Sequence, residues 1–133
     1  MRTFKARLTG GQEVPRVQTV ASGDAVFRLS QDGSRLFFRL VVRNIARVTQ
    51  AHIHLGRKGQ NGPVVAFLFG PSKFGISVRR GVVRGSLTSN DLVGPLAGMR
   101  LSDLINEMRN CNTYANVHTI QNPNGEIRGQ ILK

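Results

Sequence analysis

Several residue types are scarce or absent in this 133-residue chain, and each absence narrows the class of protein. With one cysteine, no disulfide can form within the chain, so cysteine usage does not indicate a compartment. Aromatic residues are sparse, with seven Phe, one Tyr and no Trp. No apolar run approaches the roughly 18 residues of a membrane-spanning helix, and the N-terminal stretch MRTFKARLTG lacks the apolar segment of a signal peptide. The length and the 40% hydrophobic content predict a single domain over residues 1–133.

Acidic residues are also few, and their arrangement argues against an enzyme. Seven Asp and Glu stand against 19 Lys and Arg, which gives a formal net charge of +12. The acids show no paired spacing, and the motifs of serine hydrolases, metalloproteases and phosphate-binding loops are absent. The surplus of positive charge predicts attraction to an anionic partner, either a protein or a polyanion, with nucleic acid less favoured. The second interpretation is a solvated surface whose charges repel one another.

Alternation of apolar and polar residues predicts a mostly β protein. Asp32-Gly33 is a strong turn signal and predicts a hairpin with a two-residue turn. The cross-strand pairs that this turn predicts are all apolar, namely Leu29 with Leu36, Phe27 with Phe38 and Ala25 with Leu40. The arginines of RLFFRLVVRNIAR would also suit one face of a helix, but the Phe, Val and Ile content favours a strand.

The rest of the chain predicts further short strands and one helix. Strands are expected at roughly residues 48–55, 63–69, 80–87, 113–119 and 126–132. A short helix is expected near residues 102–109, with Ser102 as its N-cap and with Leu104, Ile105 and Met108 buried. About eight strands at this spacing predict an all-β fold, an antiparallel Greek-key β-sandwich.

The three histidines lie in two strand segments with one polar face each, AHIHL and YANVHT. Successive side chains on a strand point to opposite faces, so His52 shares a face with His54, and His118 shares one with Asn116. If the two strands are neighbours, the three imidazoles meet and could hold copper or zinc. The alternative is that the histidines are structural and bond to neighbouring groups. The candidates for orienting the rings in a metal site are Asn116, Glu126 and Glu13.

The hairpin carries a second candidate site on its polar face. Four arginines alternate there with apolar residues and surround Phe37, and they are Arg28, Arg35, Arg39 and Arg43. A basic sheet face with an aromatic side chain can bind single-stranded nucleic acid or another polyanion. The alternative is a solvated face that protects the sheet from pairing with other chains.

Motifs along nearly the whole chain, from about Phe4 to Ile131, resemble those of the CHRD domain, the module named after chordin. They are FKARLTGGQEVP, ASGDAVFRL, LFFRLVVRNI, AHIHLGRKGQNGPVV, GSLTSNDL and YANVHTIQNPNGEIRGQI. One departure is Arg16 after Pro15, where the family often has a second proline. The resemblance implies an exported or cell-surface protein with no agreed molecular activity. That address conflicts with the missing signal peptide, which leaves a cytoplasmic location as the alternative.

The resemblance also implies a sandwich similar to immunoglobulin domains and copper–zinc superoxide dismutases. In the dismutases a His-x-His pair binds copper, and His52 and His54 match that pair, with His118 as the third ligand. The bridging histidine and the zinc ligands of the dismutases have no counterpart here, so dismutase activity is not expected. The sequence therefore predicts a non-enzymatic, metal-binding CHRD domain. The alternative is an interaction module with structural histidines and a basic face; no motif indicates the oligomeric state.

Overall fold

A computed structural model describes residues 2–133, and within them the chain forms seven β-strands and one α-helix. The elements in chain order are β1 (Thr3–Thr9), β2 (Ser22–Leu29), β3 (Leu36–Leu55), β4 (Val64–Phe69), β5 (Ile76–Leu87), α1 (Leu101–Arg109), β6 (Thr113–Thr119) and β7 (Ile127–Gln130). Short 3-10 turns follow β1 and β5. All the strand pairings are antiparallel. The predicted all-β class with one helix is confirmed.

The hairpin of β2 and β3 has the predicted register, but its turn is longer than expected. The three predicted apolar pairs all face each other across the two strands. The Ser30 backbone N–H donates to the Arg35 carbonyl at 2.8 Å, so the loop has four residues, 31–34, instead of two. Gly33 has a φ of +77°, which a residue with a side chain rarely adopts. Because both loops are centred on the same point, the register is the same for either length.

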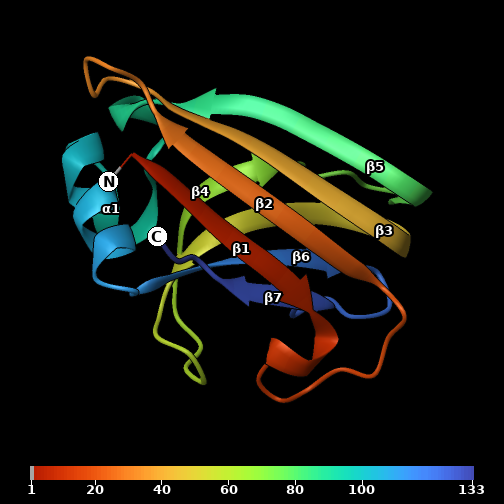
Figure 1. Cartoon of the computed structure of the whole chain (residues 1–133). Coiled ribbons are helices and arrows are strands. Elements are labelled where there is room, and N and C mark those ends of the chain that lie inside the picture. Colours follow the sequence, from red (N-terminus) through yellow and green to blue (C-terminus); the bar gives the residue numbers. More distant parts are fainter. Residues whose placement is uncertain (1) are drawn as a thin grey trace.

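Strand β3 joins the two halves of the molecule. Its 20 residues were expected as two strands, but they form one strand that bends near residues 44–47. Asn44 and Arg47 have φ values of 52° and 55°, and the register with β5 shifts between Ile45 and Val48. Before this bend β3 pairs with β2 and β5, and after it β3 pairs with β4 and β6 (Figure 1), while the pairing with β5 extends as far as Val48.

These pairings differ from the expected Greek-key sandwich of about eight strands. The pairs β1–β2, β2–β3, β3–β6, β6–β7 and β7–β1 close a ring of five strands. Strands β4 and β5 pair with β3 outside that ring. The physical reason is the length of β3. Because this one bent strand pairs in both halves of the molecule, the strands form one continuous sheet instead of two separate sheets.

The interior of the ring holds the hydrophobic core, and α1 packs against one end of it (Figure 1). Helix α1 buries Leu104, Ile105 and Met108 as predicted, together with Leu101. The N-cap is Arg100, two residues before the predicted Ser102, because the helix already begins at Leu101. The Asp103 carboxylate accepts the Arg100 backbone N–H at 3.0 Å and so completes the first turn. Within residues 2–133 no helix is long and apolar enough to cross a membrane.

Candidate metal centre

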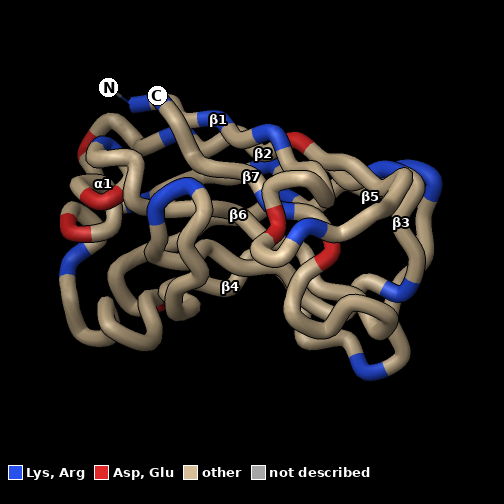
Figure 2. Tube along the Cα trace, turned by 90° about the horizontal axis from the view of Figure 1, so that it is seen from below, with Lys and Arg blue, Asp and Glu red and all other residues tan. Residues whose placement is uncertain are grey.

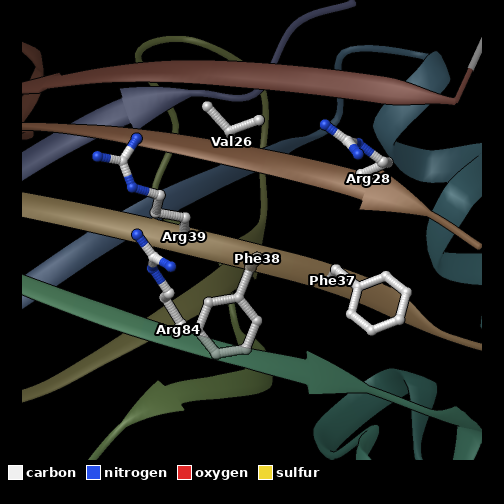
Figure 3. Close-up of a pocket in the computed structure, with 6 residues that line it drawn as sticks. All are labelled: Val26, Arg28, Phe37, Phe38, Arg39 and Arg84. Carbon is white, nitrogen blue, oxygen red and sulfur yellow. The ribbon is translucent and has the colours of Figure 1, made fainter.

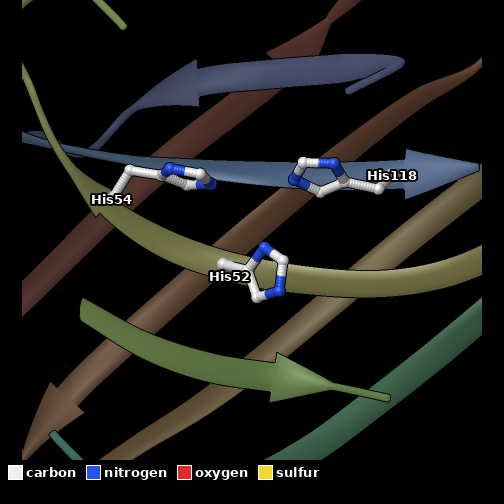
Figure 4. A group of neighbouring side chains, drawn as sticks. All are labelled: His52, His54 and His118. Atoms are coloured by element: carbon white, nitrogen blue, oxygen red, sulfur yellow. The ribbon is translucent and has the colours of Figure 1, made fainter. Parts of the chain in front are cut away.

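The three histidines come together on the side of β3 and β6 that faces away from the core. Ala51, Ile53, Ala115 and Val117 point into the hydrophobic core, so the polar residues between them point outward. One potential ligand atom from each histidine lies within 4.8 Å of the other two. Figure 4 shows the three rings close together, with His52 and His54 from β3 and His118 from β6. The predicted meeting of His52, His54 and His118 is confirmed.

Each imidazole uses one ring nitrogen for a hydrogen bond to an oxygen acceptor. His52 Nε2 bonds to Gln50 Oε1 at 3.0 Å, His54 Nδ1 to the Gly62 carbonyl at 2.9 Å, and His118 Nδ1 to the Pro123 carbonyl at 2.8 Å. An oxygen acceptor requires that this nitrogen carries the hydrogen. The other nitrogen of a neutral ring is therefore left with a free lone pair.

The three remaining nitrogens form the centre of the site. They are His52 Nδ1, His54 Nε2 and His118 Nε2, and each is buried without a hydrogen-bond partner among residues 2–133. Buried polar atoms without partners are rare in proteins because each one costs about 1–3 kcal/mol. Three of them in one small region are the expected arrangement for metal ligands whose opposite nitrogens are fixed by hydrogen bonds.

Burial keeps the three rings neutral. The exposed fractions of His52, His54 and His118 are 4%, 7% and 8%. Loss of solvation, together with the charges of His118 and His54, lowers the pKa of His52 to about 3. Burial lowers the pKa of His54 to about 4 against the opposing hydrogen bond to Gly62, and burial also lowers the pKa of His118. The rings are therefore unprotonated at neutral pH, which is the form that binds metals.

Aromatic side chains hold two of the rings in place. Phe67 of β4 meets the His52 ring edge to face, with ring centroids 4.4 Å apart. The Tyr114 ring stacks on His54 with centroids 4.7 Å apart and an interplanar angle of 8°. The Tyr114 hydroxyl in turn accepts the Gly62 backbone N–H at 3.0 Å, from the same residue whose carbonyl bonds to His54. The histidine geometry is thus fixed before any ligand arrives.

The family model of the CHRD domain matches residues 4–131. The chain belongs to the CHRD domain family. The resemblance of its sequence motifs to this family is therefore confirmed, and all three histidines lie inside the matched region. A search of curated protein sequences found no match.

The residues expected to orient the imidazoles of this CHRD domain have other partners. Asn116 donates to the Glu13 carboxylate and to the Ile127 carbonyl. The Glu126 carboxylate accepts from the end of β6 and from two loops, namely from Thr119, from Thr19 before β2, and from Gln121 and Asn122 after β6. The predicted role of Asn116, Glu13 and Glu126 is thus corrected. They tie the loops after β1 and β6 to the sheet, while the rings bond to Gln50 and to two carbonyls.

Gln50 was not expected at the site, although the sequence contained a signal for it. It lies two residues before His52, so both side chains leave the same face of β3. Its carboxamide oxygen is also the one side-chain acceptor among the three groups that fix the rings. The other two acceptors, the carbonyls of Gly62 and Pro123, lie in loops and carry no side-chain signature.

Replacing Gln50 with Leu is expected to lower metal affinity about tenfold, because the His52 tautomer is no longer fixed. The measurement is the dissociation constant for Zn(II) or Cu(II) by calorimetry. The matched variant Gln50→Glu keeps an oxygen acceptor for His52 Nε2 and should bind within about twofold of the wild type. Equal affinity of Gln50→Leu and the wild type would show that Gln50 does not position the ligand.

The predicted arginine face lies on the opposite half of the molecule. Arg28 and Arg39 point outward and are exposed, whereas Arg43 is half-buried and binds Asp24 at 2.7 Å. Arg35 lies just before β3 and donates to the Ser86 hydroxyl at 3.3 Å. Figure 2 shows how Lys and Arg gather along β1, β2 and the β3–β5 end of the CHRD domain. Pairing with β5 adds cations that were not expected, Arg84 opposite Arg39 and Arg80 opposite Arg43.

Proposed function

We propose that this CHRD domain binds a transition metal ion, copper or zinc, through His52, His54 and His118, and that it has no catalytic activity of its own. The observation that carries the proposal is the set of three buried, unpartnered ring nitrogens. Imidazole nitrogens are good ligands for copper and zinc and poor ones for magnesium or calcium. An ion among them would replace three unsatisfied lone pairs by three coordinate bonds.

The surroundings of the histidines support binding without catalysis. The two buried carboxylates among residues 2–133, Glu13 and Glu126, are held by hydrogen bonds to other groups. A metal-activated water would therefore have no free general base beside it. The aromatic rings of Phe67 and Tyr114 lie against the histidines and restrict access to the ion. These features suit holding an ion better than turning over a substrate.

The test is to remove bound metal with a chelator and then to measure the binding of Cu(II) and of Zn(II) by calorimetry. The wild type should take up one ion per chain. His54→Ala should weaken binding by at least about 100-fold, because one of three ligands is lost. Cys111→Ser is the matched control, since it removes the one thiol of the chain and should leave the affinity unchanged.

Two results would contradict the proposal. The first is equal uptake of metal by the wild type and by His54→Ala. The second is loss of binding in Cys111→Ser with retention in His54→Ala, which would assign the ion to the thiol.

A further inference from the structure

We propose that a second surface of the protein, separate from the histidine site, binds single-stranded nucleic acid. The surface is the outward side of β1, β2, the first half of β3, and β5, and it is called the basic face here. Its cations are Lys5, Arg7, Arg28, Arg39, Arg43, Arg80 and Arg84. Seven cations from four neighbouring strands thus point to one side of the sheet.

The basic face holds arginines that lie beside each other without a compensating carboxylate. Arg39 of β3 and Arg84 of β5 are directly opposite in the antiparallel register, as Figure 3 shows. Like charges in this position destabilise a sheet. Asp24, the one acid on this face within residues 2–133, is already bound by Arg43 at 2.7 Å and lies 3.6 Å from Arg7. An anionic ligand placed between Arg39 and Arg84 would remove their repulsion.

An exposed aromatic ring lies in the same place. A groove of about 440 Å³ runs over the basic face and is lined by Arg28, Phe37, Arg39 and Arg84 together with Val26 and Phe38. Phe37 is 47% exposed and lies at the start of β3, next to its first residue, Leu36. Figure 3 shows its ring over the sheet at the end of the groove where Arg28 lies, with Arg39 and Arg84 at the other end. Arginines with an accessible aromatic ring provide for both parts of a nucleotide, the phosphate and the flat base.

The composition of the basic face favours nucleic acid over other polyanions. Six of its seven cations are arginine, whose planar guanidinium binds phosphate through two hydrogen bonds and stacks on bases. A sulfated polysaccharide or a lipid headgroup would use the charges but would have no flat aromatic group for Phe37. Double-stranded DNA keeps its bases stacked inside the helix and would not offer one to Phe37 either. The chemistry therefore points to a single strand.

The test is fluorescence anisotropy with a labelled oligothymidylate of about 15 nucleotides, a length that exceeds most single-strand sites. We expect binding at low salt. The logarithm of the association constant should fall linearly with the logarithm of the salt concentration, with a slope near −2, which is about −0.7 for each of three phosphates. Phe37→Ala should weaken binding to the oligonucleotide about tenfold. The same variant should bind heparin as the wild type does, because heparin gains nothing from the ring.

Arginine variants and a charge-matched control locate the surface. Arg39→Gln and Arg84→Gln should each weaken oligonucleotide binding and reduce the salt slope by about 0.7. Lys58→Gln removes the same charge from the loop beside Arg128 and β7, near Arg7 but outside the groove lined by Arg39 and Arg84, and should leave both unchanged. Thermal melts of all four variants check that the fold is intact.

Several outcomes would overturn the proposal. The first is no binding of the oligonucleotide at low salt. The second is binding of a duplex of the same length with equal affinity. The third is an affinity for anionic vesicles or heparin that Phe37→Ala lowers as much as it lowers the affinity for the oligonucleotide. A loss in Lys58→Gln equal to that in Arg39→Gln would show attraction to net charge instead of a site. Because the two surfaces lie on different halves of the molecule, Arg39→Gln should keep wild-type metal uptake, so failure of one proposal leaves the other testable.

Discussion

Replacing Arg128 with Met is expected to lower the free energy of unfolding by about 3–5 kcal/mol, although the new side chain fills most of the same space. Arg128 is 1% exposed, which is unusual for a cation. Its guanidinium donates to the Asn61 side chain at 3.1 Å and to the carbonyls of Arg57 and Gln60 at 3.0 and 2.7 Å. Met would leave these buried acceptors without a donor.

The same substitution should weaken metal binding, because Arg128 holds the loop that contacts His54. The guanidinium lies over the Tyr114 ring, 3.5 Å from its centroid, and Tyr114 stacks on His54. Its hydrogen bonds fix residues 57–61, and Gly62, the next residue, accepts the His54 hydrogen bond. Urea unfolding gives the stability, and hydrogen exchange of the amides of residues 56–62 gives the local effect.

Two further variants make the Arg128 prediction specific. Arg57→Gln removes an exposed arginine from the same loop, with one hydrogen bond to the Asn110 carbonyl at 3.2 Å, and should cost less than about 1 kcal/mol. Arg128→Lys keeps the charge but not the planar guanidinium, so its loss of unfolding free energy should lie between those of Arg57→Gln and Arg128→Met. A stability of Arg128→Met within about 1 kcal/mol of the wild type would mean that the loop is held by other contacts.

The histidine cluster could be predicted from the sequence because it depends on a short-range rule. Alternation along AHIHL and YANVHT decides on which face of the sheet each ring lies. The pairing of the two strands with each other could not be read from this alternation. The acceptors behind the rings could not be predicted in the same way. The Gly62 and Pro123 carbonyls lie where they do because loops are tied down by distant residues, such as Asn61 donating to the Val14 carbonyl at 2.7 Å.

The fold shows the same division between local and long-range causes. The β2–β3 register followed from apolar residues on both sides of one turn, and the structure has that register. The continuity of β3 did not follow, because Asn44 and Arg47 adopt positive φ values that side-chain patterns do not reveal. The place of Arg84 on the basic face was not predicted for a related reason. Strand β5 pairs with β3, some forty residues earlier in the chain, and the sequence of β5 alone does not indicate this partner.

Lowering the pH from 7 to 5 is expected to destabilise the metal-free protein by at least about 2 kcal/mol, as the net result of opposing titrations. This figure counts His52, His54 and Glu13, and His118 adds to the loss because burial lowers its pKa as well. In the unfolded chain a histidine has a pKa near 6.5, whereas the folded values are about 3 for His52 and about 4 for His54. Above pH 6.5 both states are neutral and the stability is fully present. Below it only the unfolded state takes up protons, so each of these two rings costs about 2 kcal/mol at pH 5.

The titration of Glu13 changes the stability in the opposite direction. Burial raises its pKa from 4.5 to about 7, against the Asn116 hydrogen bond and the charge of Arg128. Between these values the folded state holds a proton that the unfolded state releases, so the contribution of Glu13 to stability grows as the pH falls from 7 to 5. That gain is about 2 kcal/mol and offsets the cost of one histidine.

Glu13→Gln separates the two effects, because the carboxamide still accepts the Asn116 hydrogen bond but does not titrate. The loss of stability of this variant between pH 7 and pH 5 should rise to at least about 4 kcal/mol. His54→Phe, which keeps a ring against Tyr114, should reduce the loss by about 2 kcal/mol in either background. The measurement is urea unfolding in chelator at both pH values. If Glu13→Gln is as stable at pH 5 as at pH 7, the imidazoles take up protons in the folded state and cannot be the buried, neutral rings on which metal binding depends.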